Sequence, residues 1–172
     1  MVRSMLEALQ ADGPHPDHAK ELALFGRFVG AWAVDNAYFH EDGEERYEAE
    51  WRFGWTLDGR AVQDVLFNPP ASKADGTHAH SQHIGTTVRL FEPATGDWTV
   101  IWFSATRGNV VTLRGRPDGD DIEMVGENRR GDALRWRFFE IAGDSFHWHG
   151  FIRPRDGGEW RLEQEMSARR VS

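Results

Sequence analysis

The sequence predicts an all-β protein, an up-and-down antiparallel barrel of about ten strands with a helix capping one mouth. Turn signals recur at a steady spacing, and the short runs between them are rich in Trp, Phe, Val and Thr with apolar residues at alternate positions. No helix-length segment interrupts the series after Gly30. This pattern is typical of antiparallel strands joined by hairpins. A meander of this size favours closure into a barrel whose interior can hold one small ligand.

Nine breaks divide the chain into the ten expected strands. Most of the breaks are built on Gly with Asp or Asn, the residues that tolerate the backbone of tight turns. They lie at 40–45, 57–60, the long loop after Phe67, 92–97, 105–109, 116–121, 128–133, 141–145 and 153–159. Because each run is joined to the next by a short connection, we expect neighbouring strands to pair in sequential order, with no parallel pair.

Composition excludes several classes of function. The 172 residues suffice for one domain with a real core, and the net charge of −8 disfavours binding to nucleic acid or to an anionic membrane. The chain has no Cys, which excludes disulfides and thiolate metal or redox sites. The first residues lack the apolar stretch of a signal peptide and no run approaches transmembrane length, so a cytoplasmic location is expected.

Two segments are expected, a helical one at 1–29 and the barrel at 30–172. Residues Met1–Gln10 favour a short helix that ends at the Ala-Asp-Gly-Pro sequence. A second helix is predicted from Asp17, which can act as its N-cap, to about Phe28. Its apolar side, which includes Leu22 and Phe25, would cover one mouth of the barrel.

Turn length decides which residues of each strand face the interior, because a shift of one residue exchanges the two faces. A three-residue loop at 57–59, with Gly59 in the left-handed conformation, would pair Trp51 with Val65 and Phe53 with Gln63. Gln63 would then point inward among aromatic rings.

The hairpin at 141–145 allows two registers. A two-residue loop would place Trp136 beside His149, whereas a three-residue loop would place Phe138 beside Trp148 and Glu140 beside Phe146. We favour the second register because it gathers the large apolar residues on one face. It also turns the His and Arg residues of both strands toward solvent.

Alternation along the other strands completes the expected interior. The inward residues there are Trp32, Val34, Asn36, Tyr38, Val88, Leu90, Val100, Trp102, Ser104, Ile122, Met124, Trp160, Leu162, Gln164 and Met166. These side chains could simply fill a small barrel, but several amides lie in phase with the rings, and buried amides need hydrogen-bond partners. An aromatic pocket with a few polar groups is typical of small-molecule sites. The predicted ligand-binding residues are Asn36, Tyr38, Trp51, Gln63, Trp102, Phe138, Trp148 and Gln164.

A family resemblance supports the same fold. Gly30-Ala31-Trp32 resembles the Gly-x-Trp signature of lipocalins and other calycins, in which the Trp packs beneath an Arg from the last strand. Arg169 and Arg170 offer that partner here. The segments "EWRFGWTLDGRAVQDV", "GTTVRLFEPATGDWTVIW" and "LRWRFFEIAGDSFHW" resemble the bacterial lipocalin-like family of unknown function labelled DUF1579. The resemblance spans about 28–170 and implies a calycin-type barrel, with no established reaction and no catalytic residues.

Histidines supply the candidate metal ligands. His78, His80 and His83 form H-x-H-x-x-H in the long loop, a weak candidate for zinc or copper because no strand or helix holds the ligands. His147 and His149 share one strand face, expected outside the barrel. Haem would need a neutral imidazole at the cavity, and no strand histidine is expected there. We therefore expect neither a metal nor another cofactor.

Three classes of function remain. The favoured one is binding of a small hydrophobic or aromatic molecule in the cavity. The alternative is a cofactor-free isomerase, cyclase or hydratase acting on an apolar substrate, with Glu140 as general base and Tyr38 or Tyr47 as proton donor. The third is a filled barrel that makes protein contacts. Outward-facing Ile101 and Phe103 would then form a partner surface, either for the N-terminal helix or for the second subunit of a homodimer.

Overall fold

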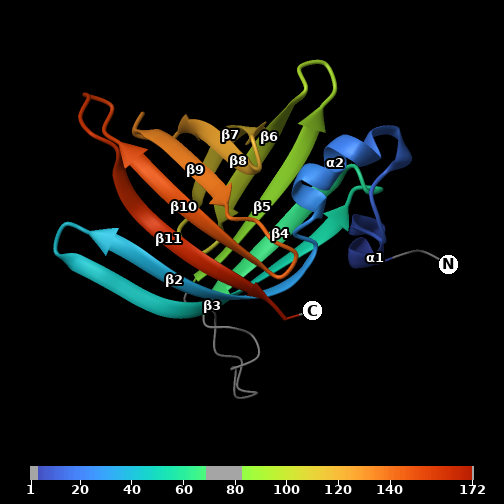
Figure 1. Cartoon of the computed structure of the whole chain (residues 1–172), viewed down its shortest axis with the longest axis horizontal. Helices are drawn as coiled ribbons and strands as arrows, with labels where there is room; N and C mark the ends of the chain where they lie inside the picture. Colours follow the sequence, from blue (N-terminus) through green and yellow to red (C-terminus); the bar gives the residue numbers. More distant parts are fainter. Residues whose placement is uncertain (1–3, 69–82, 172) are drawn as a thin grey trace.

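Ten long antiparallel strands close into a barrel, as the turn spacing predicts (Figure 1). The structure is a computed structural model that describes residues 4–68 and 83–171. Each strand pairs with the next in sequence, and the pairing of β11 with β2 completes the ring. The strands are β2 (Gly30–His40), β3 (Gly43–Thr56), β4 (Ala61–Asn68), β5 (His83–Glu92), β6 (Asp97–Ser104), β7 (Asn109–Asp118), β8 (Asp121–Glu127), β9 (Ala133–Phe139), β10 (Ser145–Arg153) and β11 (Arg161–Arg170).

Short elements precede the barrel: α1 (Met5–Leu9), β1 (Gln10–Ala11), the 3-10 turn η1 (Pro16–His18) and α2 (Ala19–Gly26). Ser4 caps α1 through a reciprocal arrangement with Glu7. The prediction that Asp17 caps the second helix is wrong, because Pro16 opens a separate 3-10 turn that includes Asp17. No helix in the described residues is long and apolar enough to cross a membrane.

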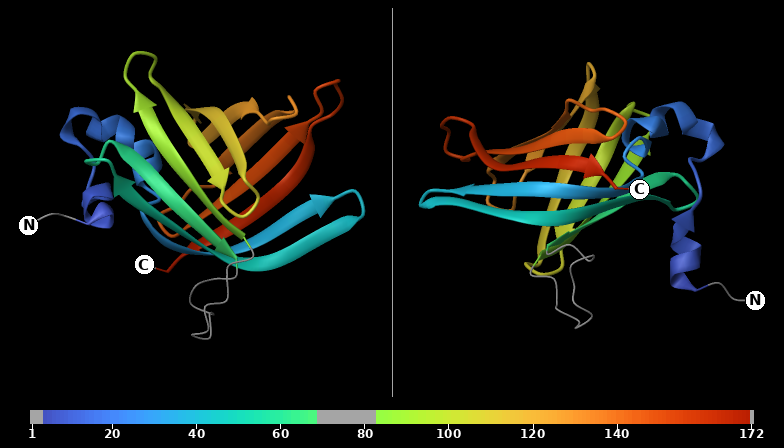
Figure 2. Two further views of the ribbon diagram at one scale, coloured as in Figure 1. Left: turned by 180° about the vertical axis from the view of Figure 1, so that it is seen from behind. Right: turned by 60° about the horizontal axis from the view of Figure 1, so that its bottom comes forward.

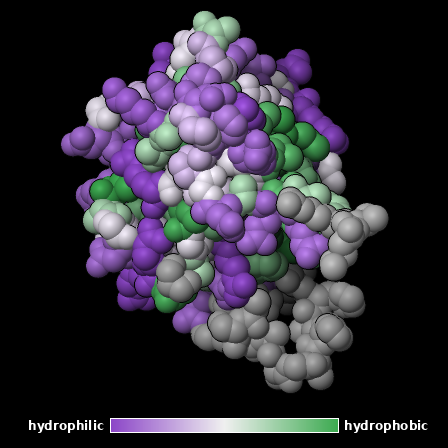
Figure 3. Space-filling model, turned by 90° about the vertical axis from the view of Figure 1, so that its right-hand side faces the viewer, coloured by the Kyte–Doolittle hydropathy of each residue, from purple (hydrophilic) through white to green (hydrophobic). Residues whose placement is uncertain are grey.

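Helix α2 closes one end of the barrel, as expected. Its Leu22 and Phe25 are buried, and Phe28 follows them into the interior. The Phe28 ring centroid lies 4.7 Å from that of Phe138, and the Phe25 centroid lies 4.9 Å from that of Trp98. These rings form an aromatic plug beneath the helix. Viewed from the side that carries the N-terminal helices, the surface is mainly hydrophilic with scattered apolar patches (Figure 3).

Hairpins alternate between the two ends of the barrel, because the strands run up and down (Figure 2). The connections at 57–60, 93–96, 119–120 and 140–144 lie at the end that α2 covers. Those at 41–42, 105–108, 128–132 and 154–160 lie at the opposite end. We call this opposite end the mouth.

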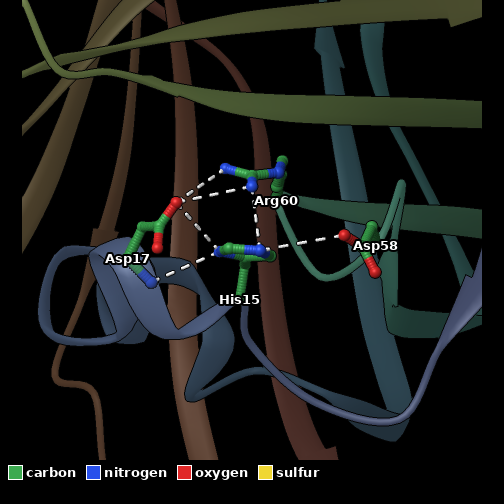
Figure 4. A network of polar contacts seen from close by, with 4 residues as sticks. All are labelled: His15, Asp17, Asp58 and Arg60. Carbon is green, nitrogen blue, oxygen red and sulfur yellow. Dashed lines mark hydrogen bonds and ion pairs between the residues drawn. The ribbon is translucent and has the colours of Figure 1, made fainter.

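The N-terminal segment is tied to the hairpin between β3 and β4 (Figure 4). The His15 amide donates to the Gly59 carbonyl at 2.9 Å, and the Leu57 amide donates to the Leu9 carbonyl at 3.0 Å. The Arg60 guanidinium lies 2.8 Å from His15 Nε2 and donates to the carboxylate of Asp17. Backbone and side-chain contacts with the N-terminal segment therefore stabilise this hairpin.

The expected register of this hairpin is wrong by one residue. The loop has four residues, 57–60, so that Thr56 pairs with Ala61 and Gly54 pairs with Gln63. Leu57, Asp58 and Gly59 all have left-handed backbones, with φ of 53°, 60° and 72°. The contacts with the N-terminal segment stabilise this longer turn, which local sequence does not reveal.

Gln63 consequently lies outside the barrel, where its amide donates to Thr86 Oγ1 at 3.1 Å. The expectation that Val88 and Leu90 of β5 face the interior is also wrong. Thr87 and Arg89 are buried and line the interior, while Val88, which pairs with Gln63, faces outward with Leu90.

A β-bulge in β11 changes which residues face the interior near the mouth. Gly150 pairs with Gln164 but Phe151 pairs with Leu162, which leaves Glu163 as an extra residue in β11. The bulge reverses the alternation, so the prediction that Trp160 and Leu162 face inward is wrong. Trp160 instead lies between the guanidinium groups of Arg135 and Arg153, 4.8 and 4.9 Å from its ring centroid.

Candidate functional site

A cavity of about 230 Å³ occupies the half of the barrel nearest the mouth, beyond the aromatic plug. It is larger than the roughly 150 Å³ that accommodates benzene and smaller than the usual pocket for a drug-sized ligand, about 300–1,000 Å³. One or two rings would fill it. The lining includes Tyr38, Trp51, Asp64, Leu66, Thr87, Arg89, Trp102, Val111, Met124, Leu134, Trp136, Trp148, Gly150, Ile152, Gln164 and Met166.

Four tryptophans form the walls of the cavity. The Trp136 ring packs edge-to-face against Trp148 at 5.4 Å and against Trp102 at 6.1 Å. Trp51 stacks on Phe138 at 5.7 Å, at the boundary with the plug. Gly150 leaves room for this arrangement, since a Cβ built there would lie 2.7 Å from the Trp148 ring.

A buried ion pair stands at the inner end of the cavity. Arg89 Nη1 lies 2.6 Å from Asp64 Oδ2, and each side chain is only 2% exposed. Asp64 Oδ1 also accepts the Thr87 amide hydrogen at 3.1 Å. The guanidinium carbon lies over the rings of Phe25, Phe53 and Phe138 at 5.1, 5.2 and 5.8 Å. Opposite charge and aromatic faces together compensate the cost of burying this cation.

Tyr38 and Gln164 line the side of the cavity formed by β2 and β11. Gln164 Nε2 donates to Asn36 Oδ1 at 2.7 Å. Burial is the main reason why the pKa values of Tyr38 and Tyr47 are raised above the usual range, so both phenols stay protonated at neutral pH. Tyr38, which lines the cavity, can therefore donate a hydrogen bond to a ligand oxygen, whereas Tyr47 of β3 is not among the cavity-lining residues.

The mouth continues into a groove of about 450 Å³, which shares Asn109, Asn128, Ile152 and Glu163 with the cavity. Four arginines border this groove: Arg107, Arg129, Arg130 and Arg161. The acidic side chains there are Asp132 and the bulged Glu163. The mouth is thus locally basic in a chain whose net charge is −8.

The structure brings together most of the predicted ligand-binding residues. Tyr38, Trp51, Trp102, Trp148 and Gln164 line the cavity. Phe138 is buried behind Trp51, and Asn36 is buried against Gln164. Gln63 is the exception, because of the corrected register.

Sequence reasoning missed most of the polar residues that line the cavity: Asp64, Thr87, Arg89, Arg107, Asn109, Asn128 and Glu163. The observed hairpin pairing turns Asp64 inward, and Arg89 shares that face because it pairs with inward-facing Val62. Glu163 reaches the cavity through the bulge. The extra residue between Trp160 and Gln164 gives no distinct signal in the alternation of that strand.

Glu140 does not face the cavity, and its prediction as an inward-facing base is wrong. The favoured register is otherwise correct, since Phe138 pairs with Trp148. Glu140 follows the last paired residue of β9 and has a left-handed backbone, with φ of 49°, which turns its side chain away from the barrel. The side chain is 73% exposed, and its Oε2 lies 3.5 Å from His147 Nε2.

The histidine candidates give no metal site in the described part of the chain. His78 and His80 lie outside the described residues, and His83 begins β5 with a side chain that is likewise not described. His147 and His149 face outward, as expected, beside Phe139 and Glu165. Among the residues that are described, no three His, Asp or Glu side chains are grouped to hold a metal ion.

The outer face of β6 and β7 carries apolar side chains. Phe103 pairs with Val110 across the two strands, and they are 40% and 45% exposed. Ile101 is half-buried on the same face. That this face forms a homodimer remains a prediction.

Comparison with known proteins identifies a fold and no family. No family model and no curated protein matches the chain. A crystal structure of Rv2717c from M. tuberculosis matches with a TM-score of 0.64 and 18% identity, over 92% of this chain and 99% of that one. The S-type phycobiliprotein lyase CPES from Guillardia theta matches with a TM-score of 0.57 and 12% identity, over 87% of this chain and 92% of that one. The protein therefore has a lipocalin-like barrel fold.

Proposed function

We propose that this protein binds one small, mostly apolar ring compound in the barrel cavity. The observation that carries the proposal is the cavity of about 230 Å³ walled by Trp51, Trp102, Trp136 and Trp148. Such rings offer a large rigid contact area for another ring. A barrel built only for stability would fill this volume with side chains, as it does at the end beneath α2.

The ligand class follows from the lining. Apolar side chains such as Leu66, Met124 and Leu134 occupy the walls between the tryptophans, which favours a hydrocarbon framework. The polar groups are few and gathered at particular places, namely the ion pair at the inner end and the amides and phenol along one side. This combination is typical of sites that bind a ring compound with one or two oxygen atoms.

Binding is favoured over catalysis because the base required by the catalytic alternative, Glu140, lies at the outer rim. The cavity does contain two other carboxylates. Asp64 is engaged by Arg89, and Glu163 lies toward the groove. An isomerase in this cavity would have to use Glu163 as base with Tyr38 as proton donor.

The test is calorimetric titration with indane, a neutral bicyclic hydrocarbon that matches the size of the cavity. Wild-type protein should bind it with one site. Ile152→Trp should abolish binding, because Ile152 lies where the cavity meets the groove and a larger ring would block the junction. Ile101→Trp, a matched change on the outer face of β6, should leave binding intact. Failure of the folded wild-type protein to bind either indane or its ketone counterpart 1-indanone would refute the proposal.

A further inference from the structure

Among the side chains that line the cavity, two carry a buried N–H donor with neither a hydrogen bond nor an ion pair among the described residues. The donors are Arg89 Nε and Trp51 Nε1. Their side chains are only 2% and 4% exposed. Buried donors in folded proteins nearly always have a hydrogen-bond partner, so a buried donor without one needs a physical explanation.

The two side chains that carry these donors pack on the same two rings, Phe53 and Phe138. The Trp51 ring centroid lies 4.9 Å from that of Phe53 and 5.7 Å from that of Phe138. The Arg89 guanidinium carbon lies 5.2 and 5.8 Å from the same two centroids. Both residues also line the cavity, which places their side chains within reach of its inner end.

Charge determines what kind of acceptor fits there. Asp64 already neutralises Arg89 at 2.6 Å, so the inner end carries no net positive charge. A carboxylate or phosphate placed beside this pair would bring an uncompensated negative charge into a buried site, which is costly. A neutral carbonyl oxygen adds no charge and has two lone pairs, which suit two N–H donors.

We propose that the natural ligand is a ring compound with a neutral carbonyl oxygen, a ketone or quinone, whose oxygen accepts hydrogen bonds from Arg89 Nε and Trp51 Nε1. The carbonyl enters first and the hydrocarbon rings lie between the tryptophan walls. This inference rests on the proposed function and deepens it. It also gives the buried ion pair a role in recognition: Asp64 holds the guanidinium in place and leaves its Nε available.

The experiment compares 1-indanone with indane, which differ by one carbonyl group. Wild-type protein should bind 1-indanone roughly tenfold more tightly, the usual effect of an added hydrogen bond to a charged donor. The carbonyl carbon resonance of ¹³C-labelled 1-indanone should move downfield on binding, because hydrogen bonding polarises the C=O bond. A purely structural role for Arg89 would not move that resonance.

Variants then show which N–H groups bind the carbonyl oxygen. In the double variant Asp64→Leu/Arg89→Met the ratio of the two affinities should fall close to one and the downfield shift should disappear. Trp51→Phe, which removes one donor and keeps an aromatic ring, should lower the ratio in part. Trp98→Phe is the matched control, because Trp98 is buried in the plug against Phe25 and does not line the cavity.

Each result discriminates between the two proposals. Equal affinity of wild-type protein for the two compounds, or an unchanged ratio in the folded double variant, would overturn the carbonyl inference and leave the cavity as a site for hydrocarbons. If neither compound binds to the folded wild-type protein, the proposed function itself fails.

Discussion

The guanidinium carbon of Arg170 lies 4.1 Å from the centroid of the Trp32 ring, across the seam where β11 pairs with β2. Arg170 also donates to three carbonyl oxygens, those of Arg27, Val29 and Gly143, at 2.7–2.9 Å. The indole of Trp32 donates to the Phe28 carbonyl at 2.7 Å and is fully buried. The two residues thus join the last strand, the first strand and the segment that follows α2.

Replacing Trp32 by Ala should destabilise the protein by about 3–5 kcal/mol, because a buried ring is lost and a cavity remains. Urea unfolding monitored by far-UV circular dichroism measures the change. Trp160→Ala is the control: Trp160 lies on the outer surface between two arginines, so its loss should cost much less. Equal losses of unfolding free energy in the two variants would contradict the conclusion that Trp32 stabilises the seam between β11 and β2.

The buried ion pair gives a prediction about stability alone. Arg89→Met should cost about 3–5 kcal/mol, because it leaves the Asp64 carboxylate buried without its cation. The double variant Asp64→Leu/Arg89→Met should recover most of that loss, since apolar residues of similar volume can replace a buried ion pair. The same urea unfolding completes the double-mutant cycle. A double variant less stable than the single one would show that the charges themselves stabilise the barrel.

Gly150 should tolerate no side chain without a change in the cavity. A Cβ there would meet the Trp148 ring at 2.7 Å and the Trp136 ring at 3.5 Å, so Gly150→Ala should displace Trp148 and weaken indane binding at least several-fold. Crowding of this kind should also cost about 1–3 kcal/mol of stability. Calorimetry and urea unfolding report the two effects. Gly143→Ala is the control, since nothing lies within 4 Å of a Cβ built at Gly143.

Alkaline titration tests the burial of the two tyrosines, which are the only ones in the chain. Burial raises the pKa of both Tyr38 and Tyr47 above the value near 10 expected in the unfolded chain. The folded state therefore holds these protons more tightly, and its stability is complete below pH 10 and falls as the pH rises beyond it. Absorbance at 295 nm should show less tyrosinate near pH 10 in folded protein than in guanidinium chloride, where both tyrosines titrate normally. A tyrosine that titrates normally in the folded barrel would contradict this burial.

The fold could be predicted because its signals are local. Each Gly-containing break needs only its own few residues to define a hairpin, and alternation such as that of Trp32 and Val34 needs only one strand. The hairpin between β9 and β10 also follows from local sequence, because only one register gathers Phe138 and Trp148 on the same face.

The candidate site was harder to predict because two of its features arise from contacts distant in sequence. The four-residue turn before Ala61 is held by Leu9 and His15, and no property of the turn itself indicates that length. The register that follows from it decides whether Gln63 or Asp64 faces the cavity. An ion pair such as Asp64–Arg89 is also unexpected inside a barrel, since composition alone assigns charged residues to the surface.

The bulge at Glu163 has an evolutionary consequence. Between Arg161 and Gln164 the chain has one residue more than its partner strand, so the loss of a single codon there would restore regular pairing. Residues on both sides of the deletion would keep their faces, because Leu162 already pairs with Phe151 and Gln164 with Gly150. Only the Glu163 carboxylate would be lost from that position of the mouth. A related gene could thus alter the chemistry of this rim by a change in length, with every other amino acid unaltered.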